Sequence, residues 1–148
     1  MAIVKENLWN EVDHPSLYVV TTNAFIKKNG DLVMGAGAAQ QAVNGLPTIA
    51  RECAKVITHG ETYGFRIVRR PTDTHRGFGI FQVKRFWMED ADTKLIEISA
   101  GSLIAYAINH SGVSIRMNYP GIGNGKLSKE EVAPLIDELA NYVTICYY

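Results

Sequence analysis

The sequence has no long hydrophobic run and very little cysteine. No segment approaches the roughly 18 consecutive apolar residues of a membrane span, and the start, residues 1–7, has no apolar core of signal-peptide length. We therefore expect no membrane contact and a cytoplasmic protein. The two cysteines, Cys53 and Cys146, lie far apart and share no metal-ligand spacing, which predicts buried, reduced thiols.

Metal-ligand spacing is also missing among the histidines, and no sign of charge is in excess. His14, His59, His75 and His110 fall in separate segments, which predicts surface or capping positions and no metal site. Fifteen basic residues balance fifteen acidic ones, so any attraction to nucleic acid must be local. With 148 residues, 47% of them hydrophobic, we expect one folded domain spanning residues 1–148.

Strand patterns and helix patterns alternate along the chain. Short runs of β-branched and aromatic residues predict strands at 17–22, 63–68, 79–83, 113–117 and 143–147. Turn formers at 71–77 predict a hairpin, and therefore a mixed sheet. We expect two helical pieces that meet near 44–45, a long helix after Asp90 and Asp92, which would cap it, and a helix that Ser128 opens in a capping box with Glu131. These elements favour an α/β fold, a three-layer α/β/α sandwich with a mixed central sheet.

Two glycine-rich loops each precede a predicted helix. They read Met34-Gly35-Ala36-Gly37 and Pro120-Gly121-Ile122-Gly123-Asn124-Gly125. Glycine lets the backbone approach a ligand closely, and the unpaired N–H groups at a helix start attract an anion. Either loop alone could be a tight turn, but a pair of them suits a diphosphate.

The two loops do not match the standard nucleotide-binding motifs. Pro120 stands where a Walker loop begins with glycine, and Leu127 stands where it has a hydroxyl residue. The first loop lacks the third glycine of a dinucleotide-binding turn, and a long polar loop separates it from the preceding strand. We therefore expect neither a P-loop enzyme nor a Rossmann site, and no bound cofactor.

The order and separation of these features resemble the macrodomain family over nearly the whole chain. Within that family the chain is most similar to the branch of the terminal ADP-ribose protein glycohydrolase and the DNA ADP-ribosyl glycohydrolase antitoxins. Three segments carry this resemblance: Val4-Lys5-Glu6-Asn7-Leu8 resembles the first-strand motif ending in Gly-Asn-Leu or Gly-Asp-Leu, Met34-Gly35-Ala36-Gly37 resembles Met-Gly-x-Gly, and Val83-Lys84-Arg85-Phe86-Trp87 resembles Thr-Lys-x-His-Trp.

The resemblance implies a role for each matching residue. Asn7 would contact an adenine, Asn23 a distal ribose, and the two glycine loops the two sides of a diphosphate. Amide side chains and backbone N–H groups suit such contacts. The residues expected to bind the ligand are Asn7, Leu8, Asn23, Met34, Gly35, Ala36, Gly37, Gly121, Ile122, Gly123, Asn124 and Gly125.

The same resemblance makes Lys84 the expected catalytic residue. A lysine shielded from water can attack the C1 of a sugar as a neutral amine, or stabilise a leaving group as a cation, and the sequence leaves both roles open. The chain departs from the pattern at Glu6, which replaces a glycine, and at Phe86, which replaces the histidine. No aspartate follows the second loop, where the protein-directed enzymes have one, because Lys126, Leu127 and Ser128 come next.

Three functions agree with these residues. The chain is expected to bind ADP-ribose and to hydrolyse mono-ADP-ribose linkages on DNA or protein. The alternatives are a non-catalytic ADP-ribose reader and an ADP-ribose phosphate phosphatase. If DNA is the partner, its phosphates would meet a local cluster of positive charge on the hairpin, which otherwise is a solvated, edge-protecting face. The cluster comprises Arg66, Arg69, Arg70, Arg76 and Arg85.

Overall fold

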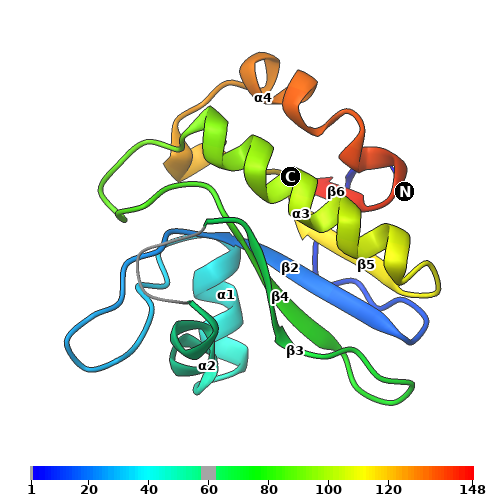
Figure 1. Cartoon of the computed structure of the whole chain (residues 1–148), viewed down its shortest axis with the longest axis horizontal. Helices are drawn as coiled ribbons and strands as arrows, with labels where there is room; N and C mark the ends of the chain where they lie inside the picture. Colours follow the sequence, from blue (N-terminus) through cyan, green and yellow to red (C-terminus); the bar gives the residue numbers. More distant parts are fainter. Residues whose placement is uncertain (1, 58–62) are drawn as a thin grey trace.

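A mixed β-sheet forms the centre of the molecule (Figure 1). The computed structural model describes residues 2–57 and 63–148. In this part of the chain six strands lie in the order β1-β6-β5-β2-β4-β3. Neighbouring strands are parallel except for the β3–β4 hairpin, which is antiparallel. The strands are β1 (Ile3–Lys5), β2 (Ser16–Thr22), β3 (Phe65–Arg69), β4 (Gly77–Gln82), β5 (Ser114–Asn118) and β6 (Thr144–Tyr147).

Helices cover both faces of the sheet and complete a three-layer sandwich (Figure 1). One layer holds α1 (Ala38–Gly45) and α2 (Ile49–Val56), and the other holds α3 (Thr93–Asn109) and α4 (Lys129–Ile136). Short 3-10 turns occur at η1 (Gly123–Gly125) and η2 (Leu139–Asn141). The predicted α/β/α sandwich with a mixed sheet is therefore confirmed.

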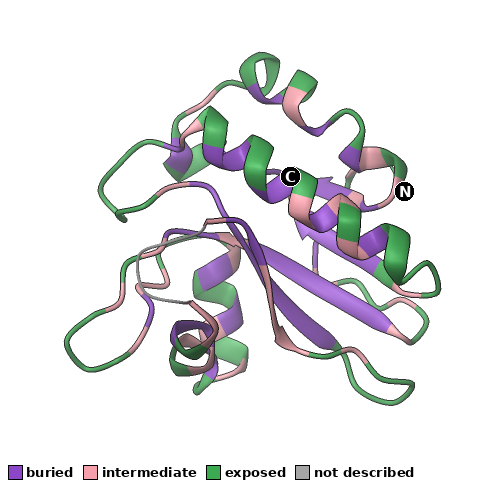
Figure 2. Ribbon diagram, viewed as in Figure 1, coloured by how far each residue is buried: buried purple, intermediate pink, exposed green. Residues whose placement is uncertain are grey.

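Alternating side chains of β2 divide the interior into two cores. Leu17 and Val19 pack into the core under α3 and α4, whereas Tyr18 and Val20 pack into the core under α1 and α2. This alternation follows from the two-residue period of a strand. Because both faces are covered, almost every residue of β2 and β4 is buried (Figure 2).

Local capping explains where the later helices begin. Ser128 and Glu131 form the predicted capping box at the start of α4. Asp92 is the N-cap of α3, and its side chain accepts a hydrogen bond from the N–H of Lys94 at 2.8 Å. Asp90, which was also predicted to cap this helix, stands two positions ahead and is not the N-cap.

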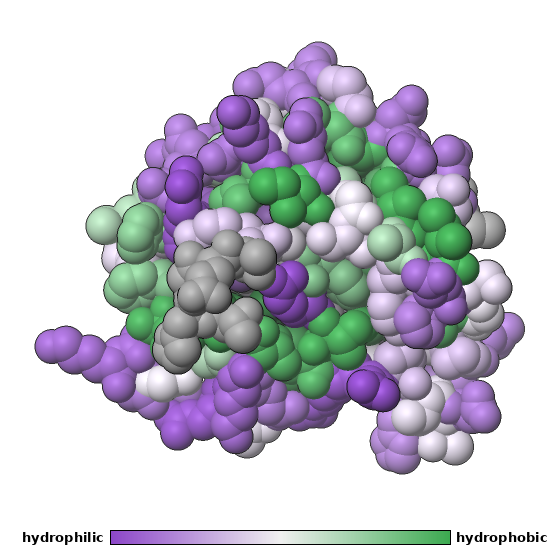
Figure 3. Space-filling view, in the orientation of Figure 1, coloured by the Kyte–Doolittle hydropathy of each residue, from purple (hydrophilic) through white to green (hydrophobic). Residues whose placement is uncertain are grey.

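On the face shown in Figure 3, hydrophilic side chains occupy most of the outline, and hydrophobic ones gather toward the middle. In the described residues no helix is long and apolar enough to cross a membrane. Cys53 and Cys146 are buried, free thiols, as the sequence predicts.

Candidate functional site

A cleft of about 700 Å³ opens where the parallel strands end. Its lining includes the last residues of β2, β5 and β6 and the segment that follows β4. Open α/β sheets commonly bind ligands at the carboxyl ends of their strands. The volume lies within the range of small-molecule sites, about 300 to 1,000 Å³.

The first glycine loop forms one wall of this cleft. Gly35, Ala36 and Gly37 line it, and Gly37 is the N-cap residue of α1. Gly37 has φ 73° and ψ −138°, a conformation that side chains with a Cβ rarely adopt. No side chain caps α1, and no acceptor in the described part of the chain meets the N–H groups of residues 35–37. These donors are available to a ligand at a positively polarised helix end.

The second glycine loop forms the opposite wall. Gly121 has φ 79°, and a Cβ there would lie 2.8 Å from the Cδ1 of Ile96, so the loop requires glycine to pack on α3. The N–H groups of Ile122, Gly123 and Asn124 also meet no acceptor among the described residues. Two walls thus offer backbone donors to the same space.

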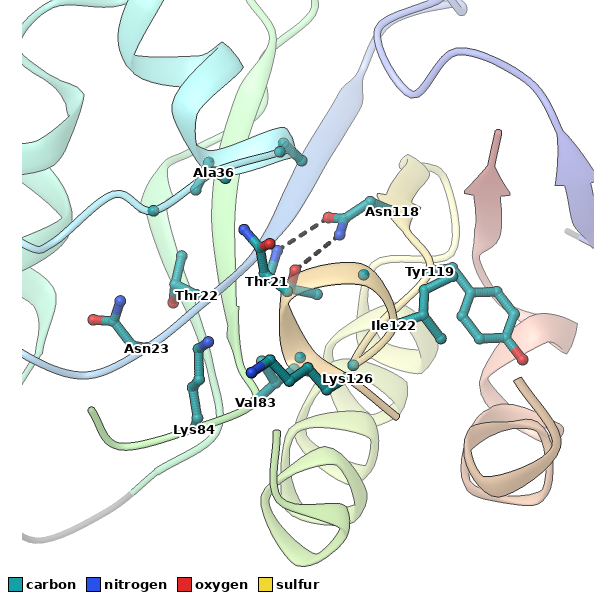
Figure 4. A pocket seen from close by; sticks show the side chains of 18 of the residues that line it. Thr21, Thr22, Asn23, Ala36, Val83, Lys84, Asn118, Tyr119, Ile122 and Lys126 are labelled. Atoms are coloured by element: carbon teal, nitrogen blue, oxygen red, sulfur yellow. Dashed lines mark hydrogen bonds between the residues drawn. The ribbon is translucent and has the colours of Figure 1, made fainter. Parts of the chain in front are cut away.

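Polar residues at the strand ends form the floor. The amide of Asn118 ties β5 to β2, because its Oδ1 accepts from the N–H of Thr21 at 3.0 Å and its Nδ2 donates to the Thr21 hydroxyl at 2.8 Å (Figure 4). Thr22 follows on β2 and is 5% exposed. Its hydroxyl has no hydrogen-bond partner within the described residues. Buried polar atoms in folded proteins nearly always have a hydrogen-bond partner, and a bound ligand can provide one for this hydroxyl.

Lys84 lies at the edge of the floor, where the chain leaves β4. Backbone hydrogen bonds hold this segment to the end of β2: Val83 donates to Thr22 at 2.9 Å, and Ala24 donates to Arg85 at 3.1 Å. In Figure 4 the amine of Lys84 extends into the cleft beside Thr22. Burial is the main cause that lowers the pKa of this amine below its usual value. Lys84 therefore lines the cleft, in surroundings that weaken its hold on the proton.

An apolar lip extends outward from Lys84, and we use this name for Phe86, Trp87 and Met88. All three side chains are at least half exposed, and Trp87 and Met88 line the cleft. Phe25 meets Phe86 with ring centroids 5.8 Å apart. Exposed aromatic residues beside a cleft mark a contact surface.

Asn23 lines the cleft but is already occupied by backbone contacts. Its Nδ2 donates to the carbonyl of Val33 at 2.9 Å, and its Oδ1 accepts from the N–H of Phe25 at 2.9 Å. These bonds shape the chain that leads into the first glycine loop. One N–H and one oxygen lone pair remain for a ligand.

Three residues predicted to bind the ligand do not line the cleft. Leu8 is 1% exposed and packs in the core under α1 and α2, and Met34 packs against the same core. Leu8 and Met34 thus belong to the core behind the cleft and not to its lining. Asn7 lies behind the cleft-lining Tyr148, whose hydroxyl is 3.5 Å from the Asn7 Oδ1.

Arg116 fixes the segment that carries Asn7. It is 6% exposed, and its guanidinium donates to the carbonyls of Leu8 at 3.1 Å and Asn7 at 3.0 Å and to the Glu6 carboxylate at 2.9 Å. Glu6, the residue that departs from the family glycine, thus has a structural partner inside the fold. The ion pair stabilises the strand end beside the cleft.

Three of the five predicted arginines already pair with carboxylates. Arg69 pairs with Glu52 of α2 at 2.7 Å, Arg76 pairs with Glu11 at 3.2 Å, and Arg85 approaches Asp92 at 3.4 Å. Arg66 donates to the carbonyl of Phe65, and Arg70 is exposed. None of the five lines the cleft.

No metal-binding group is found within residues 2–57 and 63–148, where three or more His, Cys, Asp or Glu side chains never gather in suitable geometry. His75 contacts Thr74, and His110 stacks on Tyr106 with centroids 4.0 Å apart. His59 lies outside the described residues.

Sequence reasoning missed several cleft residues. Thr21, Thr22 and Asn118 give no local motif, but all three lie at the ends of parallel strands, and that position is the available signal. Lys126, which follows the second glycine loop, also lines the cleft. The cleft places its side chain opposite Lys84 (Figure 4).

Comparison with known proteins identifies the class of fold. No family model matches the sequence, and no curated protein matches it. Among solved structures, the macrodomain of Thermus aquaticus DarG has a TM-score of 0.71 at 24% identity, covering 99% of this chain and 97% of that one. The macrodomain of Mycobacterium tuberculosis DarG has a TM-score of 0.69 at 22% identity, with 99% and 97% covered.

A third structure is a larger protein, Thermosipho africanus DarTG in complex with ADP-ribose. It has a TM-score of 0.61 at 22% identity and covers 89% of this chain, which spans 37% of that one. The chain therefore has the macrodomain fold, and the resemblance stated from the sequence is confirmed at the level of the fold.

Proposed function

We propose that this chain binds ADP-ribose in the cleft and hydrolyses mono-ADP-ribose linkages on DNA or protein. The observation that carries the proposal is the pair of glycine loops, which line the same cleft and hold N–H groups without an acceptor in the described residues. Such a clamp suits a diphosphate without adding counter-charge. The similar fold of a protein solved with ADP-ribose supports the same ligand.

The polar floor gives the ligand a direction. Lys84, Thr22 and Asn23 lie together on one side of the loops, and Asn7 lies beyond Tyr148. With the diphosphate between the loops, the distal ribose would meet the first group and the adenine would approach the second. This orientation brings the C1 of the distal ribose toward the Lys84 amine.

Lys84 can act on that carbon in two ways. As a neutral amine it attacks C1, forming an N–C1 bond, while the bond from C1 to the macromolecule breaks and its electron pair leaves with a group that takes up a proton. Water then hydrolyses the lysine adduct and restores the free amine. As a cation, Lys84 instead stabilises negative charge on the leaving group while water attacks.

The choice between DNA and protein depends on what covers the apolar lip. A nucleobase can stack on exposed aromatic rings such as Trp87, which favours DNA. Long-range attraction to phosphates through Arg66, Arg69, Arg70, Arg76 and Arg85 is the weaker part of the proposal, because three of them already pair with carboxylates. Salt dependence of DNA binding would report any contribution they make.

The test follows release of ADP-ribose from modified DNA and modified protein, together with calorimetry on the same samples. We expect Lys84→Ala to keep most ADP-ribose affinity and to lose turnover by about 10²- to 10⁴-fold, the scale for removing one catalytic group. Lys84→Arg stays protonated, so it should rescue only the electrostatic role.

The pH profile separates the two roles. Because the pKa of Lys84 is lowered, release should rise with pH through that pKa if the neutral amine attacks. Release should fall over the same range if the cation does the work. Wild-type protein that binds ADP-ribose and releases none from either substrate would instead be a reader, and full activity in Lys84→Ala would exclude Lys84 from catalysis.

A further inference from the structure

Lys126 has an unusual backbone conformation at the end of the second glycine loop. Its φ of 63° is the only positive value at a non-glycine residue within the described chain. Such a conformation is uncommon for lysine and persists where the surroundings impose it. Here the Lys126 N–H donates to the carbonyl of Gly123 at 2.9 Å, and the next N–H, of Leu127, donates to Gly121 at 2.9 Å.

The loop that carries Lys126 is also bound to the segment that follows Lys84. The carbonyl of Gly125 accepts from the N–H of Ala91 at 2.9 Å, and a Cβ on Gly125 would lie only 3.0 Å from that of Ala91. Lys84 and Lys126, which are 42 positions apart in sequence, are thus held at one end of the cleft. In Figure 4 both side chains extend into the same space.

Neither lysine has a salt bridge to a carboxylate within the described residues. Burial is the first cause that lowers the pKa of Lys84, the charges of Asp90 and Glu89 raise it, and the charge of Lys126 lowers it. The nearby charges of Arg85 and Asp92 are paired with each other. The fold therefore places a second cation beside a partly buried amine.

We propose that Lys126 is a positioning residue whose charge maintains a fraction of Lys84 as the neutral, nucleophilic amine. A neighbouring cation is one of the ways in which proteins activate a lysine. The inference rests on the proposed function of Lys84 and favours the nucleophilic role over the electrostatic one.

The experiment measures the protonation of Lys84 without any substrate. The folded protein is treated with a limiting amount of acetic anhydride from about pH 6 to about pH 11, a range that includes the ordinary lysine pKa, and acetylation of Lys84 is quantified by mass spectrometry. The variants are Lys126→Met, which removes the charge at similar length, and Lys126→Arg, which keeps it. Lys28→Met, an exposed lysine outside the cleft, is the control for charge removal.

We expect Lys126→Met to move the labelling midpoint of Lys84 to higher pH and to lower labelling severalfold at about pH 8. Lys126→Arg and Lys28→Met should leave the midpoint unchanged. An unchanged midpoint in Lys126→Met, or an equal shift in Lys126→Arg, would overturn the proposal. Thermal melting confirms that each variant is folded.

This result does not depend on catalysis. If the chain releases no ADP-ribose but Lys126→Met shifts the labelling midpoint, the proposed hydrolysis fails while the coupling of the two lysines stands. If release is observed, Lys126→Met should lose activity near neutral pH and regain it at alkaline pH. A loss that is equal at every pH would contradict a role through Lys84 protonation.

Discussion

The buried hydroxyl of Thr22 is the residue-scale feature that most directly points to a ligand. It lies at the end of β2 beside Lys84, in the floor of the cleft. Threonine in a strand usually finds a partner for its hydroxyl when buried, and this one finds none within the described residues. A polar atom left unpaired lowers stability unless something else compensates for it.

Thr22→Val tests whether the ligand uses this hydroxyl. The change keeps the side-chain shape and removes an unpaired polar atom, so the free energy of unfolding should stay equal or rise. Affinity for ADP-ribose should fall by about 5- to 10-fold, the equivalent of roughly one hydrogen bond. Calorimetry and urea denaturation give the two values. Unchanged affinity would mean that the hydroxyl does not face the bound ligand. Thr21→Val is the control, because it removes a hydroxyl that already accepts a hydrogen bond from Asn118.

At the scale of elements, one ion pair links α2 to the edge strand β3. Both guanidinium nitrogens of Arg69 that face Glu52 donate to its carboxylate, each at 2.7 Å. The hydrogen bonds from Arg69 are the largest cause that lowers the pKa of Glu52 from 4.5 to about 2. The adjacent Cys53 thiol has a raised pKa instead. Burial, and after it the negative charge of Glu52, raise this pKa to about 12.

The Glu52 carboxyl has a lower pKa when folded, so its stabilising effect is present above about pH 4.5 and is lost as pH falls through about pH 2. Arg69→Met should therefore lower the free energy of unfolding near neutral pH by about 1 kcal/mol, since the pair is partly exposed to solvent. The difference from wild type should shrink as pH falls below about 4.5.

Urea denaturation across that pH range measures the effect, and Arg70→Met is the matched control because Arg70 is exposed on the neighbouring position. A difference that stays constant down to about pH 2 would assign the loss to packing of the Arg69 side chain rather than to the ion pair.

For the whole molecule, strand and helix patterns were sufficient to predict the layers and the mixed sheet. The run of β-branched and aromatic residues at 17–22 predicts a buried strand, and the Ser128 capping box predicts where α4 begins. Glycine loops before helices carry a local signal, so both walls of the cleft could also be predicted. The catalytic role of Lys84 was predicted from the family resemblance alone, because a lysine at a strand end is equally typical of a solvated surface position.

Contacts between distant segments could not be predicted in the same way. Thr21 and Asn118 are 97 residues apart, and only the order of the strands brings them together. The sequence also contained no sign that Asp90 stands ahead of the cap, which is Asp92, or that Leu8 lies in the core and not in the lining of the cleft. Local sequence patterns do not predict that Asp90 lines the cleft or that Leu8 is enclosed by the core.

Calorimetry with ADP-ribose tests the central claim, that the cleft between the glycine loops is its binding site. Gly35→Val is the informative variant: its Cβ would meet nothing within 4 Å and its φ is not positive, unlike that of Gly37, so the fold should tolerate the change. Gly112→Val, equally open and outside the cleft, is the control. We predict that wild type and Gly112→Val bind ADP-ribose alike and that Gly35→Val binds at least about tenfold more weakly, because its side chain occupies space needed by the diphosphate. Folded wild-type protein that gives no heat with millimolar ADP-ribose, or equal affinity in Gly35→Val, would contradict the account.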